Sequence, residues 1–159
     1  MKPLFATALL VVASLAPTFA EVIAPLPIVI ASRAEAGAST YSVTTTGQPE
    51  QNLQTVQFRV TRPDAESTTI TVTLHTGKTK TVAQVTALMS SVFKKFLTAP
   101  VPNTVLGKLG SFDKGGEVDF VAESPQILRF DFRNPGEAPN SAPFTQADVT
   151  TFLALLNQQ

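Results

Sequence analysis

The 159-residue chain has the length of one domain, and its 12 basic residues balance its 12 acidic residues. A balanced charge gives no overall field that would attract nucleic acid or anionic lipid. The chain contains no cysteine, which excludes disulfides, thiol redox chemistry and thiolate metal sites. Nothing else in the sequence predicts a metal ion or a cofactor.

Residues 1–20 have the pattern of a signal peptide. Lys2 supplies the positive charge, Leu4–Leu15 forms the apolar region, and small residues precede a cut after Ala20. The sequence therefore predicts an exported protein, periplasmic or extracellular. The alternative is an uncleaved N-terminal anchor, which is the one way in which the sequence would attach the chain to a membrane.

Residues 21–40 are predicted to be an extended, Pro/Ala-rich and poorly ordered lead-in. Pro25 and Pro27 exclude a regular helix or a central strand there. The segment Ala34–Ala36 has the small-x-small form of a second cleavage site, so cleavage after Ala20 and after Ala36 both stay open.

Residues 41–159 are predicted to form a single α+β domain of two similar units, 41–99 and 103–159. Each unit has two segments of alternating apolar residues, typical of half-buried strands, followed by an amphipathic helix. The predicted elements are strands 55–62 and 68–75 with helix 81–97, then strands 117–123 and 127–133 with helix 145–159. Weaker strand patterns at 41–46, read as an edge strand, and at 104–112 leave open a βββα unit used twice.

Both predicted helices begin with Thr-x-Ala-x-Val-Thr, at Thr81 and at Thr145. This similarity indicates a pseudo-repeated ββα–ββα plan. We expect one antiparallel sheet with both helices on its apolar face and a polar face left open to solvent. In the second hairpin, a turn at 124–126 would set Glu123 opposite Arg129 and Asp119 opposite Arg133, as opposite-charge pairs favour.

The polar face carries the residues that are candidates for contacting a ligand or partner. The single histidine has no neighbour in sequence that would make it an acid or base, and threonine rows are common in strands. Asp131 lies between Arg129 and Arg133 on the same predicted face, which favours ion pairs within that surface over an anion-binding site. The candidates are Arg59, Thr71, Thr73, His75, Arg129 and Arg133.

No catalytic motif is present, so the sequence predicts no catalytic residue and favours a protein that is not an enzyme. The predicted function is an exported binding or structural module for a protein partner, using the open sheet face or the loop at 134–143. Two alternatives are a hydrolase with an unrecognised site and a binder of single-stranded nucleic acid built from a sheet-and-helix repeat. The latter needs outward aromatic residues and a basic groove, whereas the phenylalanines here are predicted on the helix-covered face.

Overall fold

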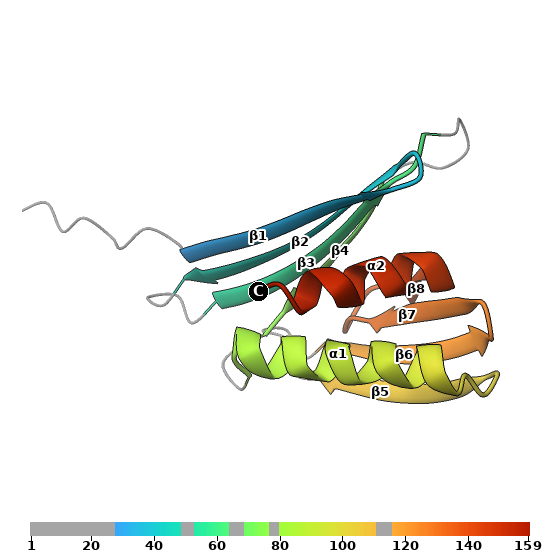
Figure 1. Cartoon of the computed structure of the whole chain (residues 1–159). Helices are drawn as coiled ribbons and strands as arrows, with labels where there is room; N and C mark the ends of the chain where they lie inside the picture. Colours follow the sequence, from blue (N-terminus) through green and yellow to red (C-terminus); the bar gives the residue numbers. More distant parts are fainter. Residues whose placement is uncertain (1–27, 49–52, 64–68, 77–79, 111–115) are drawn as a thin grey trace, which may run out of the picture.

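The computed structural model describes residues 28–48, 53–63, 69–76, 80–110 and 116–159. Within these residues the chain forms eight strands and two helices (Figure 1). The first unit contains β1 (Ile28–Ala36), β2 (Ser39–Gln48), β3 (Leu53–Thr61), β4 (Ile70–His75) and α1 (Val82–Thr98). The second contains β5 (Thr104–Gly110), β6 (Glu117–Ser124), β7 (Ile127–Arg133), β8 (Asn140–Thr145) and α2 (Gln146–Leu156).

The α+β class is confirmed, but the strands form two sheets and not one. Each sheet is an antiparallel meander of four strands, in the orders β1-β2-β3-β4 and β5-β6-β7-β8. A single eight-stranded sheet would leave much of its apolar face uncovered by two helices, whereas two facing sheets also cover each other. The expected hairpins are present as β3–β4 and β6–β7. The first has two further strands, β1 and β2, on one side, and the second has one further strand on either side.

The two helices run side by side in opposite directions (Figure 1). Each contacts both sheets: α1 packs against β3 and β5, and α2 packs against β2, β1 and β8. Each begins with a capping box, in which Thr81 and Thr145 accept a hydrogen bond from the backbone N–H three residues later. The third-residue partners are Gln84 in α1 and Asp148 in α2.

One aromatic core joins both units. The ring of Phe58 on β3 lies edge-on to Phe93 of α1, to Phe130 of β7 and to Phe152 of α2, with centroid distances of 5.7, 6.4 and 5.4 Å. All four rings are fully buried. Because these contacts link both sheets and both helices, the core belongs to the whole domain and not to either unit alone.

Three segment predictions are corrected. The lead-in is not poorly ordered over 28–40, where the chain pairs in β1 and begins β2, while residues 1–27 lie outside the described part. The expected edge strand at 41–46 is internal, since β2 pairs with both β1 and β3. The expected loop 134–143 ends early, because β8 starts at Asn140 and carries Pro143 on a sheet edge, where proline is tolerated.

The register predicted for the second hairpin is wrong by two residues. Asp119 lies opposite Asp131, Arg133 opposite Glu117, and Arg129 opposite Val121. Ser124 pairs with Ile127 across a two-residue turn, and the register then shifts by one residue between Ala122 and Ser124. A plain three-residue turn at 124–126 would give the same pairing along the rest of the hairpin, with Asp119 opposite Asp131, so the predicted charge pairs do not follow from that turn length.

A buried polar cluster fastens α2 to the first sheet. The Asp148 carboxylate accepts hydrogen bonds from the Tyr41 hydroxyl (2.9 Å), from the Arg62 guanidinium, and from the Thr145 backbone N–H (2.8 Å). Asp148 is 1% exposed and Tyr41 is 4% exposed. We call these residues, Tyr41, Arg62 and Asp148, the Asp148 cluster. It joins positions 86 and 107 residues apart in the chain.

Candidate functional site

The outward face of the second sheet contains a hollow of about 340 Å³. We call it the charged hollow. Its lining comes from β6, from β7, and from the segment that ends the 134–139 loop and opens β8. The lining residues are Asp119, Arg129, Asp131, Phe132, Arg133, Pro139, Asn140 and Ser141. The open sheet face and the loop, which the sequence offered as separate binding surfaces, therefore meet at one place.

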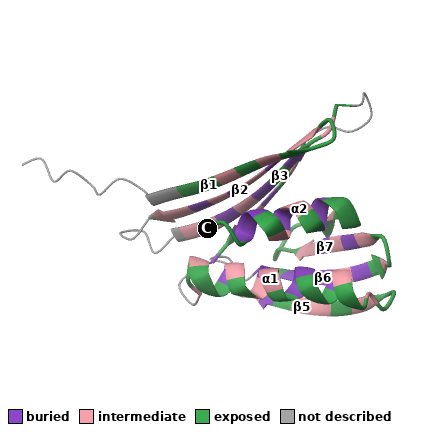
Figure 2. Ribbon diagram, viewed as in Figure 1, coloured by how far each residue is buried: buried purple, intermediate pink, exposed green. Residues whose placement is uncertain are grey.

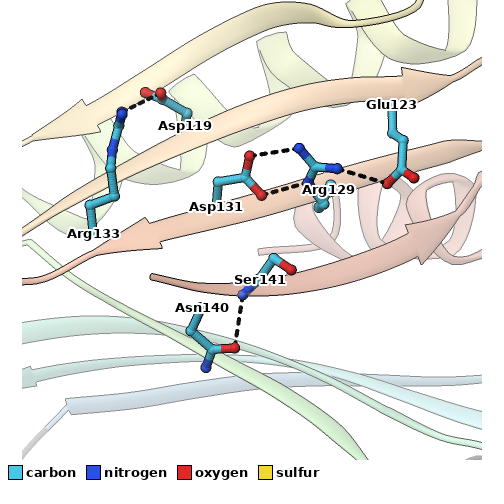
Figure 3. A network of polar contacts seen from close by, with 7 residues as sticks. All are labelled: Asp119, Glu123, Arg129, Asp131, Arg133, Asn140 and Ser141. Carbon is cyan, nitrogen blue, oxygen red and sulfur yellow. Dashed lines mark hydrogen bonds and ion pairs between the residues drawn. The ribbon is translucent and has the colours of Figure 1, made fainter. Parts of the chain in front are cut away.

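Ion pairs along β6 and β7 position the charges of the hollow (Figure 3). Arg129 makes a two-bonded contact with Asp131, with Nε–Oδ1 and Nη2–Oδ2 distances of 2.6 and 3.0 Å, and a 3.2 Å bond to Glu123. Arg133 donates to Asp119. The pairs Glu123–Arg129 and Asp119–Arg133 thus form as predicted from the sequence, but diagonally, because arginine reaches the next residue on the same face.

Asp119 is the most buried charge of the hollow, at 8% exposed. It faces Asp131 directly across the strands, and each carboxylate is compensated by its own arginine. The other oxygen of Asp119, Oδ1, accepts no hydrogen bond from any described residue but lies 3.4 Å from Lys108 Nζ. We regard this ion pair as its compensation, because an ammonium at that distance needs no ideal hydrogen-bond geometry to neutralise the charge.

The surroundings of Arg129 favour the charged form of its guanidinium. Hydrogen bonds to Asp131 raise the pKa of Arg129 above its ordinary value, and the charges of Asp131 and Glu123 act in the same direction. The outward face around the hollow carries four acidic residues and three basic ones: Glu117, Asp119, Glu123 and Asp131 against Lys108, Arg129 and Arg133. It is therefore suited to groups of both signs and not to a polyanion.

The other four candidates lie on the outward face of the first sheet. Arg59 Nε donates to Thr71 Oγ1 at 3.4 Å, and Gln57 Nε2 donates to Thr73 Oγ1 at 3.3 Å. His75 is exposed at the end of β4, opposite Thr55. The alternation that predicted these residues to point outward is correct, but the structure does not bring them to the charged hollow.

Sequence reasoning missed the uncharged half of the hollow. Phe132 and Pro139 contribute apolar groups to the lining, and Phe132 is partly buried and packs against the core. The backbone N–H of Ser141 donates to Asn140 Oδ1 at 2.8 Å (Figure 3). No local pattern in the sequence indicates this half of the hollow, because it depends on the pairing of β8 with β7, which places Ser141 opposite Asp131. The sequence predicted 134–143 as a loop, whereas residues from Asn140 onward form an edge strand that includes Pro143.

Comparison with known proteins gives no family for this chain. No protein-family model matches it, and no curated protein gives a significant match. Neither described helix is long and apolar enough to cross a bilayer. Among the described residues, no group of three or more histidine or acidic side chains is arranged to hold a metal ion.

Proposed function

We propose that this protein is a non-enzymatic binding module that engages a polypeptide partner through the charged hollow. The observation that carries the proposal is the convergence of the charged β7 row with Pro139, Asn140 and Ser141 on a single concave surface. Recognition surfaces of this kind combine arginine and aromatic side chains with polar groups that fix the orientation of the partner.

The chemistry of the lining favours a polypeptide over an anionic ligand. Each arginine is already held by an aspartate, so a phosphate or nucleic acid would have to displace a carboxylate without gaining a net positive field. A peptide segment can instead place groups of both signs on the paired charges, an apolar side chain on Phe132, and backbone amides on Asn140. Apart from the partly buried Phe132, the aromatic rings of the described residues are buried in the core, which leaves no row of exposed rings on which single-stranded bases could stack.

A hydrolase gains no support from the same surface. The only histidine of the chain, His75, lies on the first sheet, so the hollow has no histidine to activate Ser141 as a nucleophile.

Export is part of the proposal and rests on the pattern of residues 1–20, which lie outside the described residues. The intact mass of the chain recovered from its own cells tests it directly. A chain beginning at Glu21 or Gly37 supports export, and a chain that retains Met1–Ala20 contradicts cleavage.

Site-specific photocrosslinking in the native cells tests the binding surface. A photoreactive phenylalanine analogue replaces Ser141, at the rim of the hollow, and in a matched variant it replaces Thr71, exposed on the first sheet. We expect a discrete protein adduct from position 141 that is absent at position 71. The adduct should weaken when Arg129 and Arg133 are both changed to alanine.

The absence of a protein adduct at position 141 would contradict the proposed surface. Equal adducts at both positions would do so as well, because they would show that capture does not depend on the hollow.

A further inference from the structure

The free edge of β1 differs from the other sheet edges in the described residues. It is nine residues long and contains neither a proline nor a bulge. By comparison, β4 has six residues, β5 has an irregularity between Val105 and Gly107, and β8 contains Pro143. Short length, bulges and prolines protect edges from pairing with another chain, so β1 is the unprotected one.

The backbone groups on that edge are identifiable from the β1–β2 hairpin. A two-residue turn, Gly37 and Ala38, joins Ala36 to Ser39, and Gly37 has the positive φ (62°) that such a turn requires at its first position. In a two-residue hairpin the flanking pair is hydrogen-bonded, so even-numbered residues of β1 bond to β2. Odd-numbered residues, including Arg33 and Glu35, direct their N–H and C=O groups toward the open edge.

The side chains of β1 are complementary to a second copy of themselves. Arg33 and Glu35 are the only charged residues of the strand, and their side chains are 69% and 71% exposed. If two β1 strands pair antiparallel about a twofold axis at Ala34, Arg33 of each copy lies opposite Glu35 of the other. The odd-numbered residues then meet as hydrogen-bonded pairs through the groups that face the edge.

We propose that the chain forms a symmetric dimer in which the β1 strands of two copies pair and join the first sheets into one sheet of eight strands. The surface is isologous, so the contact closes after two copies. Figures 1 and 2 show β1 along a margin of the molecule, with exposed residues over much of its length.

Charge also selects the register. Moving the axis to Arg33 would set the two arginines directly opposite each other, which is unfavourable. Moving it to Ser32 would set both charges opposite uncharged residues. The axis at Ala34 is the one that makes two opposite-charge pairs, and it is the register that the tests address.

Disulfide trapping tests the contact and its register in the purified chain, which has no cysteine of its own. At the proposed axis the two Ala34 residues form a pair with Cα atoms about 4.5 Å apart, within disulfide range. We expect A34C to form a disulfide-linked dimer under mild oxidation and S32C to stay largely unlinked. A disulfide-linked dimer from S32C but not from A34C would overturn the proposed register. A chain that sediments as a monomer and forms no disulfide at either position would overturn the proposed dimer.

Charge reversal gives an independent test. R33E and E35R should each weaken the dimer about tenfold by sedimentation equilibrium, because each places two like-charge pairs across the axis. An equimolar mixture of the two variants should recover the dimer as a heterodimer, as should the double variant R33E/E35R by itself. Unchanged dimerisation in both single variants would overturn the charge pairing.

Discussion

The Asp148 cluster and the charged hollow use the same arginine–aspartate pairing in two different environments. In the cluster, Asp148 is 1% exposed. Its carboxylate accepts hydrogen bonds from the backbone N–H at the start of α2, from Tyr41 on β2 and from Arg62, the residue after β3. In the hollow, Arg129 and Asp131 are two residues apart on one strand, with side chains 34% and 29% exposed. A buried charge is costly to leave unpaired, whereas an exposed pair exchanges readily with water. The first arrangement therefore fixes the fold, and the second leaves charges free to exchange partners.

Removal of the Asp148 carboxylate is the change with the largest expected effect. Asp148→Ala leaves Arg62 and the Tyr41 hydroxyl without their partner inside the domain, so we expect a loss of about 3–5 kcal/mol in the free energy of unfolding. Chemical denaturation measures it. The matched control is Gln84→Ala, which removes the equivalent but exposed capping residue from α1 and should cost about 1 kcal/mol or less.

Equal losses in these two variants would show that Asp148 acts only as a helix cap. If Asp148→Ala does not fold, Asp148→Asn keeps the shape of the side chain, and its loss should still exceed that of the Gln84 variant.

The pKa of the Tyr41 hydroxyl gives a second test of the Asp148 cluster. Burial raises the pKa of Tyr41 above its ordinary value of 10.0, and the hydrogen bond to Asp148 and its negative charge add to this. The unfolded chain therefore loses the proton first, and the free energy of unfolding falls as pH rises from 10 through the folded-state pKa. Below pH 10 the group contributes no pH dependence, because it is protonated in both states.

Ultraviolet absorbance of tyrosinate reports this titration directly, since Tyr41 is the only tyrosine and there is no tryptophan. The folded midpoint should lie above 10, and Tyr41→Phe should remove this part of the alkaline loss of stability. A midpoint at or below 10 would contradict the contact with Asp148.

The smallest effect is expected in the hollow. Arg129→Ala should change the free energy of unfolding by less than about 1 kcal/mol, because exposed ion pairs contribute little and salt screens them. Denaturation at low and high salt checks this, with Lys94→Ala, an exposed lysine of α1 outside the hollow, as the control. A loss comparable to that of Asp148→Ala would mean that the hollow is part of the stabilising framework and not a free binding surface.

Local patterns gave much of the architecture correctly. The alternation of Val56, Phe58 and Val60 identified the buried face of β3, and all three residues are fully buried. The pattern that begins at Thr145 located the start of α2, and Thr145 is its N-cap. These predictions succeeded because side-chain period and helix capping depend on residues within one element.

The errors occur where one element depends on a distant one. β1 is a strand because β2 pairs with it, although the prolines before Ile28 suggested an irregular lead-in. The charged hollow depends on β8 lying beside β7, and Arg62 matters only because α2 returns to the first sheet. No periodicity within those segments carries that information.

By itself, the sequence determined the α+β class, the positions of both helices, the burial of the aromatic rings and the outward direction of all six candidate residues. Only the tertiary structure decided that the strands divide into two sheets, that Asp148 meets Tyr41 and Arg62, and that the charged row adjoins the 134–139 loop. The reason is physical. Local conformation follows from short-range sterics and hydrogen bonding, whereas the pairing of sheets and helices follows from how the whole set of apolar faces is best covered.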